Sequence, residues 1–483
     1  MTPLADTAEW FYSWFDYAIT AYMVTLLILG LVLVIVGWVA VNRYVRMRPL
    51  RDYSFVDQSE LSLPVTVIIP AYDEEPTIIE SLHSLLVTQF NQIEILVVND
   101  GSTDATLDRL REEFALVPTD RTPRSGLATE PVIEVFSSSV DRRLHVIDKV
   151  NGGKADALNA GLNYAQFPLV CAVDADTMLD PGALGRLVWE FQAEPDTVAT
   201  GGIVRIINGS QVKQGRITQV TTPRHLLANI QVVEYLRAFL GGRLAWSSWN
   251  CLLIISGAFG LFRRDVLVEA GGYDRETVTE DAEVILRIRR TRADRGEPCR
   301  IAFFPDPVCW TEAPVSLRQL ARQRDRWQRG LGETLIKHVG MLFRPKYGRI
   351  GWIALPYYWL FEFLEPLITI VGLTLAFIGL LAGLVSPALF ALLITFAFSF
   401  GFFVTMIVLM IEERAFRRYP SWTDLRNLAW AAFAENFGYR QWQAFVRARA
   451  IFRIRARAQH WGDMTRVGFA SADRATDSET DPR

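Results

Sequence analysis

The sequence predicts an α/β domain built on a doubly wound sheet, flanked by interfacial helices and joined to three transmembrane helices. Three observations favour this fold class. Short β-branched runs alternate with helical patterns, polar residues follow the ends of these runs, and three longer segments are apolar and uncharged. Alternating strands and helices are typical of a doubly wound sheet, in which ligands bind at the carboxyl ends of the strands.

Four runs rich in apolar and β-branched residues are expected to form buried parallel strands. They are "VTVIIP", "IEILVVND", "LHVID" and "PLVCAVDAD". Helical patterns lie in "EEPTIIESLHSLLVT", "GSTDATLDRLREEF" and "GGKADALNAGLNYA". Residues 115–130, rich in Pro, Thr, Arg and Gly, are expected to form a surface insertion. The apolar-poor tail, residues 473–483, is expected to be disordered.

Three uncharged segments are long enough to cross a bilayer, which takes about 20 residues. Basic residues flank one end of each segment, whereas the N-terminus carries Asp and Glu but no Lys or Arg. The positive-inside rule therefore places the N-terminus outside and the large polar domain in the cytoplasm, at the plasma (inner) membrane. The expected order is an outer N-terminus (1–17), a span (18–41), the α/β domain (50–315), interfacial helices (316–365), two further spans (366–385 and 388–411) and a basic interfacial or gating segment (412–472).

The composition of the chain argues against some classes of function. The 483-residue chain has a net charge of −3 and a pI near 6.1, which argues against a nucleic-acid partner because such proteins usually present a basic surface. Its mean hydropathy of +0.17 is high for a soluble protein and reflects the three apolar segments. The four cysteines lack the spacing of a metal site and are expected to be reduced and mostly buried.

Acidic residues gather where the predicted strands end. Asp174 and Asp176 follow one strand with a single residue between them, and Asp100 ends another. Carboxylates in this arrangement favour a hard cation such as Mg²⁺ or Mn²⁺, which bridges phosphate oxygens. Lys154 begins a helix after two glycines, a natural place for phosphate. The interpretation is a nucleotide-diphosphate site; the alternative for the paired acids alone is a helix cap.

Six motifs, in a fixed order, carry a family resemblance. They are "VIIPAYDEE", "VVNDGSTD", "NGGKADALNAGL", "VDADT", "TEDAEV" and "QRDRW", spread over residues 64–327. The series resembles that of membrane-embedded glycosyltransferases of family 2, which include cellulose, hyaluronan and poly-N-acetylglucosamine synthases. The resemblance implies a GT-A-like fold, a UDP-sugar donor, a glycan acceptor and inverting transfer that elongates a β-linked polysaccharide at the cytoplasmic membrane face. It also implies that elongation is processive and coupled to export.

The resemblance also implies roles for single residues. Asp73 or Glu74, together with Asp100, would contact the uridine. Lys154 and Asp174 would lie near the diphosphate, with the metal held by Asp174 and Asp176. Asp281, next to Glu280, would be the general base. Gln323, Arg326 and Trp327 would line the acceptor site and the diphosphate side. In "HWGDMTR", Trp461 and Arg466 would cover the bound nucleotide.

Several alternatives stay open at this stage. Glu280 and Asp281 also suit the start of a helix, where they would complement its dipole. "LRQLARQRDRWQRGL" is also a basic amphipathic helix suited to a membrane surface. Glu362 and Glu365 are interpreted as interfacial, or else as part of a channel. At the level of function, the alternatives are a non-processive transferase and an inactive scaffold, and three spans alone suggest a homo-oligomer or an export partner.

Overall fold

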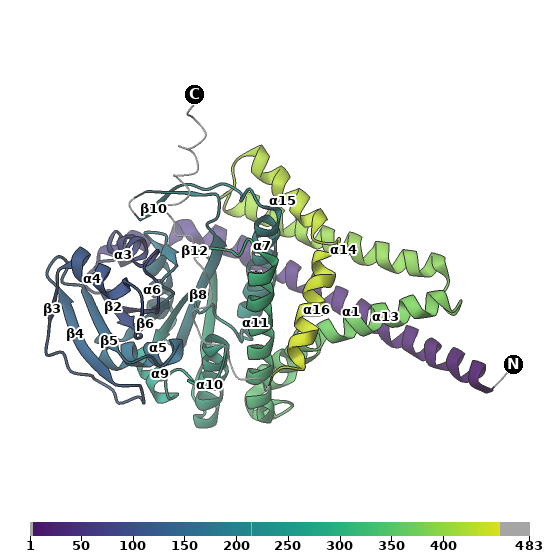
Figure 1. Ribbon diagram of the computed structural model, residues 1–483, viewed down its shortest axis with the longest axis horizontal. Coiled ribbons are helices and arrows are strands. Elements are labelled where there is room, and N and C mark those ends of the chain that lie inside the picture. The colour runs from purple at the N-terminus through teal and green to yellow at the C-terminus, as the bar shows by residue number, and fades with distance from the viewer. Residues whose placement is uncertain (1–2, 214, 455–483) are drawn as a thin grey trace.

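A mixed ten-stranded sheet lies at the centre of the computed structural model, which describes residues 3–213 and 215–454 (Figure 1). Its strand order is β3-β4-β5-β2-β1-β6-β11-β8-β12-β7. Four central strands pair in parallel, as predicted: β5 (Leu144–Lys149), β2 (Ile93–Asn99), β1 (Val65–Ala71) and β6 (Leu169–Val173). Their carboxyl ends therefore meet at one edge of the sheet.

The other strands extend this parallel centre on both sides. β11 (Phe259–Arg263) runs antiparallel between β6 and β8 (Thr197–Ile206). β12 (Arg300–Thr311) pairs in parallel with β8, with a break in register after Phe303. The edges are β3 (Leu116–Pro118), β4 (Val132–Ser138) and β7 (Met178–Leu179), and a separate antiparallel pair consists of β9 (Gln211–Lys213) and β10 (Arg216–Gln219). The sheet is thus mixed, with a parallel core.

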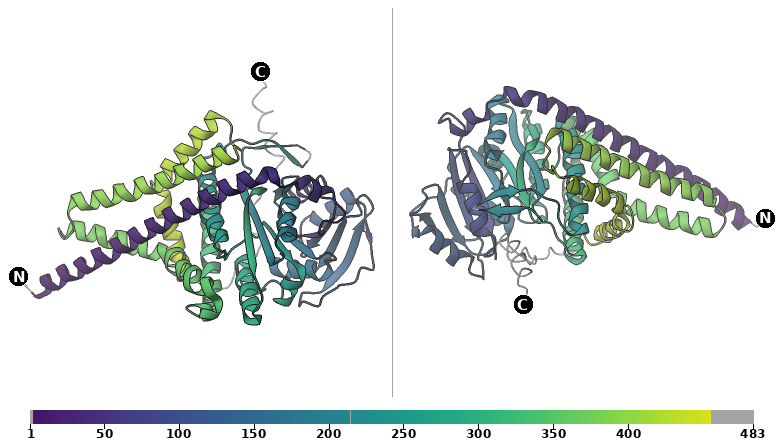
Figure 2. Two further views of the ribbon diagram at one scale, coloured as in Figure 1. Left: turned by 180° about the vertical axis from the view of Figure 1, so that it is seen from behind. Right: turned by 90° about the horizontal axis from the view of Figure 1, so that it is seen from above.

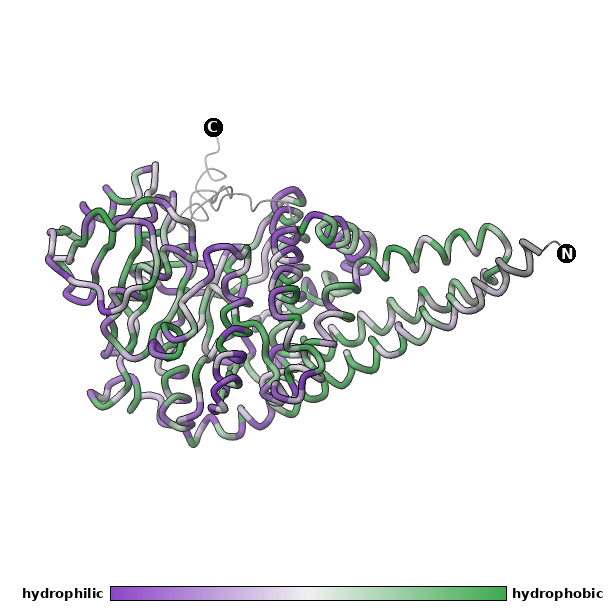
Figure 3. The backbone as a smooth tube through the Cα atoms, turned by 90° about the horizontal axis from the view of Figure 1, so that it is seen from below, coloured by the Kyte–Doolittle hydropathy of each residue, from purple (hydrophilic) through white to green (hydrophobic). Residues whose placement is uncertain are grey.

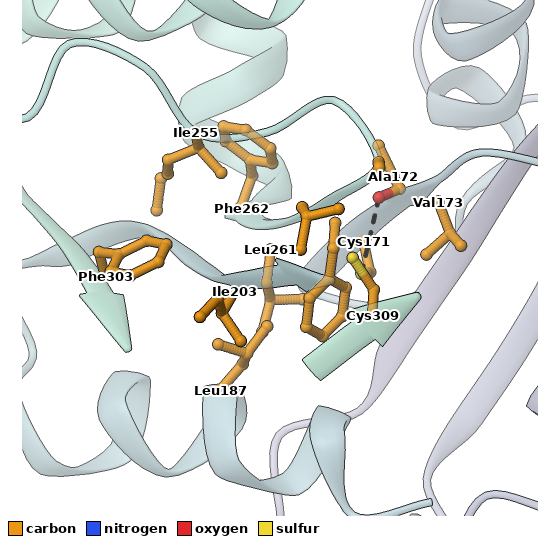
Figure 4. Packing of buried hydrophobic residues seen from close by; sticks show 14 of the residues in the cluster. Cys171, Ala172, Val173, Leu187, Ile203, Ile255, Leu261, Phe262, Phe303 and Cys309 are labelled. Carbon is orange, nitrogen blue, oxygen red and sulfur yellow. Dashed lines mark hydrogen bonds between the residues drawn. The ribbon is translucent and has the colours of Figure 1, made fainter. Parts of the chain in front are cut away.

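Apolar side chains on both faces explain why the central strands are buried. All residues of β1, β2 and β6 are buried, as expected for parallel strands covered by helices. Figure 4 shows the packing around β11, where Leu261, Ile203 and Leu187 meet Cys171 and Cys309. The four cysteines are unpaired, and three of them are buried.

Helices cover the two faces of the sheet. α5 (Lys154–Tyr164) packs against β1 so closely that a Cβ at Gly161 would collide with Ile68. α6 (Ala183–Ala193) packs on β8 and β12. The other helices of this unit are α3 (Ile78–Leu86), α4 (Thr106–Phe114), α7 (Leu226–Leu236), α10 (Glu280–Arg295) and α11 (Leu317–Lys337). The shorter ones are η1 (Arg48–Leu50), α2 (Tyr53–Gln58), η2 (Arg237–Arg243), α8 (Leu244–Ser248), α9 (Arg264–Glu269), η3 (Val339–Met341), η4 (Pro345–Tyr347), η5 (Ile350–Ala354), α12 (Leu355–Tyr357) and η6 (Tyr358–Phe363).

The segment expected to be a surface insertion is tied to the sheet. Its first residues form β3, which pairs with β4. Within the loop that follows, Arg121 is largely buried and pairs with Glu94 of β2, and its Nη2 donates to the carbonyl oxygen of Tyr164 at 2.8 Å. The composition of this segment therefore identified a loop but not its buried arginine anchor.

Three apolar helices project from one side of the α/β unit (Figures 2 and 3). They are α1 (Pro3–Met47), α13 (Glu365–Leu381) and α14 (Pro387–Ala415). In the described part of the chain, two helices are long and apolar enough to cross a membrane, within Tyr17–Leu50 and Phe390–Ala415. The pair Ile350–Phe363 and Glu365–Leu381, bent by 45°, gives a third if it is one span. This agrees with the three predicted spans.

The projecting helices are anchored to the sheet by close packing and a buried ion pair. α1 and α14 both pack against η2, where a Cβ at Gly37 of α1 would collide with the carbonyl oxygen of Leu240. Arg205 of β8 donates through Nη2 to Oε2 of Glu412 in α14 at 2.7 Å, and both side chains are buried. The membrane helices and the central sheet therefore share one core.

Two helices follow α14 in the segment predicted to be basic and interfacial. They are α15 (Trp422–Ala434) and α16 (Tyr439–Ile451). α16 packs against α11 and α13, and its Arg447 contacts three neighbours. Nε donates to Oε1 of Gln328 at 2.9 Å, Nη2 donates to the carbonyl oxygen of Glu362 at 2.6 Å, and Nη1 lies 3.4 Å from Oε2 of Glu365. Both glutamates thus meet an arginine of the C-terminal helix.

Candidate active site

Asp100, at the end of β2, holds the glycine loop before α5. Its Oδ1 accepts hydrogen bonds from Nζ of Lys149 at 2.6 Å and from N–H of Gly152 at 3.0 Å, and its Oδ2 accepts one from N–H of Gly153 at 2.7 Å. Lys149 also lies 2.7 Å from Oδ1 of Asp156 in α5. The side chains of Asp100, Lys149 and Asp156 are fully buried, so this ionic cluster fixes where Lys154 begins α5.

The turn after β1 is bound to the loop after β2. Asp73 has a positive φ of 53°, and its Oδ1 accepts a hydrogen bond from N–H of Thr103 at 2.7 Å. The N–H of Glu74 donates to Oγ1 of Thr106 at 2.9 Å, and Oε2 of Glu74 accepts from Oγ1 of Thr77 at 2.9 Å. The ends of two neighbouring strands therefore carry Asp73, Glu74 and Asp100, as the motif order predicts. The carboxylates of these residues accept hydrogen bonds from other groups of the protein.

Lys154 joins the end of β6 to the start of α10. Its Nζ lies 2.6 Å from Oδ1 of Asp174 and 3.1 Å from Oε1 of Glu280. The three side chains are 15%, 27% and 12% exposed, so the cluster opens partly to solvent. Burial opposes the charge on Lys154, but Asp174 and Glu280 outweigh it and raise the pKa of the ammonium group. A cation therefore stands among acids contributed by two distant segments.

Asp281 lies beside this cluster at the first turn of α10. Its Oδ2 accepts a hydrogen bond from N–H of Gly257 at 2.9 Å, and its Oδ1 accepts one from N–H of Ala282 at 2.9 Å. A Cβ at Gly257 would lie 3.2 Å from Oδ2 of Asp281 and 3.3 Å from Nζ of Lys154. Burial, and then the charge of Glu280, raise the pKa of Asp281 to about 6. Such a carboxylate is suited to accept a proton near neutral pH.

The "ISGAFGLF" segment supplies that close approach. Gly257 lies in the loop immediately before β11, so the backbone reaches Asp281 where a side chain would crowd Lys154. The segment runs from Ile255 to Phe262. Its second half is the buried strand β11, and its first half borders the candidate base.

The α11 helix places an aromatic face near the start of α10. Gly330 of α11 packs directly against Thr279, the residue before Glu280. The Trp327 ring is 37% exposed, and its centroid lies 6.5 Å from that of Tyr235 in α7. Oε1 of Gln323 is buried and has no hydrogen-bond partner among the described residues. Arg326, on the same helix, is partly exposed.

Comparison with known protein families identifies the family to which the chain belongs. The model of glycosyl transferase family 2 matches residues 66–269, and that of glycosyl transferase family group 2 matches residues 169–404. The chain belongs to glycosyltransferase family 2. All the site residues described above lie within these two ranges, which also include the bent helix pair and part of α14.

Among curated members of the family, the chain is similar to poly-β-1,6-N-acetyl-D-glucosamine synthases. It is 27% identical to the Staphylococcus epidermidis protein over 282 residues, which is 58% of each chain. It is also 27% identical to the Staphylococcus aureus (strain COL) protein over 285 residues, again 58% of each chain. The match thus spans 58% of the length of these relatives.

Solved structures of low sequence identity were also found. The mannosyltransferase PcManGT from Pyrobaculum calidifontis, in complex with GDP-Man and Mn²⁺, is 21% identical with a TM-score of 0.47, and the match covers 86% of this chain and 99% of that one. S. aureus TarS 1–349 in complex with UDP-GlcNAc is 17% identical with a TM-score of 0.38, and the match covers 79% and 93%.

A divalent metal is common in GT-A-like family 2 domains, and the carboxylates here can be tested against it. Asp174 and Asp176 stand on the loop after β6, with Oδ1 of Asp174 already facing the Lys154 cation. Among residues 3–213 and 215–454, no group of three or more His, Cys, Asp and Glu side chains is arranged to hold a metal. Mg²⁺ is usually bound by one or two carboxylates together with substrate phosphates. The two aspartates fit that mode, in which the donor supplies the remaining ligands.

Two residues near the site were not indicated by the motifs, and two expected ones cannot be placed. Tyr235 and Arg243 belong to no family motif quoted above, whereas Gly257 lies in the "ISGAFGLF" segment. The signal that singles out Arg243 is a charge within the apolar stretch "AFLGGRLAW". Trp461 and Arg466, expected to cover the nucleotide, lie outside the described residues.

Proposed function

We propose that this family 2 protein is an inverting glycosyltransferase that elongates a β-linked polysaccharide from a UDP-sugar. The reaction takes place at the cytoplasmic face of the plasma membrane, with the N-terminus outside, and it is processive and coupled to export. One observation carries the proposal. Lys154 stands between Asp174 and Glu280, with Asp281 beside it, at the carboxyl ends of parallel strands.

Asp281 acts as the general base. Its Oδ takes the proton from the acceptor hydroxyl as that oxygen attacks the anomeric carbon, and UDP leaves from the opposite face of the sugar. The N–H groups of Gly257 and Ala282 hold the carboxylate in one orientation. Partial desolvation makes it a better base than an exposed aspartate, since a raised pKa strengthens its hold on the proton.

Lys154 and the strand-end acids serve the leaving group. The ammonium group of Lys154 contributes positive charge at the diphosphate, where negative charge develops. Asp174 and Asp176 would hold Mg²⁺ or Mn²⁺, which when bound neutralises further charge on the diphosphate. Asp100 fixes the glycine loop through Gly152 and Gly153, so the helix N-terminus that carries Lys154 stays in place.

The acceptor is placed by the aromatic face of α11. Arg324 lies over the Trp327 ring, with Cζ 4.4 Å from the centroid. A pyranose ring stacks on the part of Trp327 that remains exposed, beside Tyr235. Gln323 and Arg326 add hydrogen-bond donors on the same helix. Because α11 packs on Thr279, a sugar held there is close to Asp281. The apolar helices α1, α13 and α14 begin on the membrane side, and a second copy or an export partner completes the path outward.

The proposal is tested with purified protein in lipid nanodiscs. Reactions contain Mn²⁺ or Mg²⁺ and one of UDP-N-acetylglucosamine, UDP-glucose or UDP-glucuronate. UDP-N-acetylglucosamine comes first because the curated relatives are named for a polymer of that sugar. UDP release and product length are measured together. Long chains at low donor conversion support processive synthesis, whereas single-sugar products would replace it with a non-processive transferase.

Removal of the metal gives a separate expected result. EDTA is expected to abolish UDP release, and added Mn²⁺ to restore it. Asp176→Asn is expected to raise the Mn²⁺ concentration for half-maximal activity at least about tenfold, because one of the two carboxylate ligands is lost. Mn²⁺ binding in the presence of UDP is followed by electron paramagnetic resonance. Asp196→Asn, at an exposed position on another loop, should match the wild type; equal Mn²⁺ requirements for both variants would refute the assignment.

The raised pKa of Asp281 predicts the pH dependence. The carboxylate accepts a proton only when ionised, so kcat/KM should fall by about tenfold per pH unit below pH 6 and reach a plateau above it. The sign follows from the role: a base loses activity as it becomes protonated. Initial rates at subsaturating donor between pH 5 and 8, in buffers of constant ionic strength, measure this. A flat profile across that range would contradict Asp281 as the titrating base.

A further inference from the structure

Arg243 is the last residue of η2, and one atom of its guanidinium group lacks a hydrogen-bond partner among the described residues. Its Nη1 atom is buried and makes no hydrogen bond within residues 3–213 and 215–454. Arg237, at the other end of η2, is different, since its Nη1 donates to Oε1 of Glu435 and to Oγ1 of Thr405, both at 2.7 Å. Burying an uncompensated donor is costly. Two arginines of one π-helix thus differ in that only one is satisfied by the protein, which points to a ligand for the other.

A chain of aromatic contacts connects Arg243 to the exposed Trp327 ring. Its Cζ lies 4.2 Å from the ring centroid of Phe239. The Phe239 ring is 6.0 Å from that of Tyr235, which in turn is 6.5 Å from the Trp327 ring. Aromatic faces pack against the apolar C–H face of a pyranose, and a charged donor at their edge pairs with its oxygens. Phe239 itself is buried and stacks on Phe303. We call Tyr235 and Trp327 the aromatic row; Arg243 is connected to it through Phe239.

The charge of Arg243 also acts on the candidate base, Asp281. Burial lowers the pKa of Arg243, and the opposing charges are those of Tyr358, Asp281 and Tyr235. The positive charge of Arg243 in turn lowers the pKa of Asp281, which burial and Glu280 raise. On its other side, η2 packs against the apolar helices α1 and α14. Arg243 therefore lies between Asp281, the aromatic row and the membrane helices.

We propose that Arg243 is a positioning residue for the acceptor. Its free Nη1–H donates to an oxygen of the terminal acceptor sugar, either a hydroxyl or an acyl carbonyl, while the aromatic row holds the ring. The reacting hydroxyl is thereby directed at Asp281. This inference rests on the proposed function and adds to it the residue that orients the acceptor between the base and the membrane helices.

The test separates acceptor binding from donor binding. Arg243→Met removes the charge and keeps the length of the side chain; Arg243→Lys keeps a charge without the guanidinium geometry. Each variant is assayed in nanodiscs with UDP-N-acetylglucosamine and a β-1,6-linked N-acetylglucosamine trisaccharide. For Arg243→Met, we expect at least a tenfold rise in the KM for the trisaccharide, donor affinity within twofold of the wild type, and a larger share of donor lost to hydrolysis. Arg243→Lys should recover part of the acceptor affinity.

Controls make each outcome decisive. Arg224→Met, at an exposed arginine before α7, should leave both KM values unchanged. Thermal unfolding shows whether Arg243→Met is misfolded. If it is, the test uses Arg243→Lys, for which the acceptor KM and the fraction of donor lost to hydrolysis are measured. A loss of donor affinity with an unchanged acceptor KM would overturn the inference in favour of a diphosphate contact. Unchanged values for both substrates would overturn it outright.

A binding measurement distinguishes failure of the inference from failure of the proposed function. Trisaccharide binding is followed by tryptophan fluorescence without donor. If the wild type binds the trisaccharide and Arg243→Met does not, the inference holds even where no donor is turned over. If the wild type releases UDP while Arg243→Met binds and transfers equally well, the inference alone fails. If the wild type neither binds the trisaccharide nor releases UDP, both fail.

Discussion

Asp281→Asn is expected to lower kcat by about 10²- to 10⁴-fold, the usual contribution of a general base. Asparagine has the same shape, but its amide has a single acceptor oxygen, so it keeps only one of the two hydrogen bonds from the N–H groups of Gly257 and Ala282. It cannot take a proton from the acceptor hydroxyl. Donor binding depends on Lys154 and the strand-end acids, so the affinity for the UDP-sugar should change little. Single-turnover transfer and donor binding by calorimetry measure the two effects separately.

A matched variant lies on the same helix. Asp294, near the end of α10, pairs at the surface with Lys346, with Oδ1 2.8 Å from Nζ. Asp294→Asn removes an equal charge from α10 without touching the site and should keep the wild-type rate. UDP release at the wild-type rate from Asp281→Asn would contradict the assignment of Asp281 as the general base. It would also support the interpretation of the protein as an inactive scaffold. A loss of donor affinity as large as the loss of kcat would assign Asp281 to donor binding instead.

Lys149→Met is expected to have the largest effect on stability. Lys149 is the cation between Asp100 and Asp156, with Nζ 2.6 Å and 2.7 Å from their Oδ1 atoms, and all three side chains are fully buried. Methionine fills most of the volume but removes the cation bound to Asp100 and leaves Asp156 with Arg275, whose Nε lies 2.8 Å from Oδ2. Breaking a buried pair in this way costs about 3–5 kcal/mol. The midpoint of thermal unfolding in detergent should fall by several degrees or more, with loss of activity because the glycine loop is no longer held.

The control for this variant is a surface pair. Lys346→Met removes the partner of Asp294, whose pair is exposed on both sides, and pairs of this kind contribute little. Its unfolding midpoint should match the wild type. If Lys149→Met unfolds at the wild-type temperature, the Asp100–Lys149–Asp156 cluster is not what fixes the start of α5. Asp100 would then be free to contact the nucleotide directly.

The elements that sequence predicted well are those that depend on local pattern. The β-branched runs became β1, β2, β5 and β6, because side chains buried on both faces leave a continuous apolar run. The three uncharged segments coincide with the projecting helices, since length and the absence of charge suffice to indicate a span. The strand-end position of Asp174 followed from the same reasoning.

Contacts between distant segments could not be read from the sequence. Lys149 is an ordinary lysine after a strand until folding places Asp156 against it. The antiparallel direction of β11 is invisible in "FGLFR" because burial on both faces has the same pattern in either direction. Arg243 was overlooked since a single charge in an apolar stretch does not reveal whether it has a partner; Arg237 has one, and Nη1 of Arg243 has none among the described residues.

The sequence left two interpretations of the start of α10, and the geometry is compatible with both. Glu280 and Asp281 suit a helix N-terminus, and Ala282 N–H does donate to Asp281. Yet Glu280 also contacts Lys154, and Asp281 also accepts from Gly257. The dipole interpretation and the site interpretation therefore describe the same two side chains, and neither excludes the other.

The Arg205–Glu412 pair has a consequence for how the enzyme matures in the cell. Its two members are 207 residues apart in the chain, so β8 leaves the ribosome long before its ion partner does. Until α14 folds against the sheet, Arg205 in β8 stays uncompensated. Under the proposed function, newly made chains should thus stay inactive until α14 is in place, so that donor is not consumed before the product can be delivered.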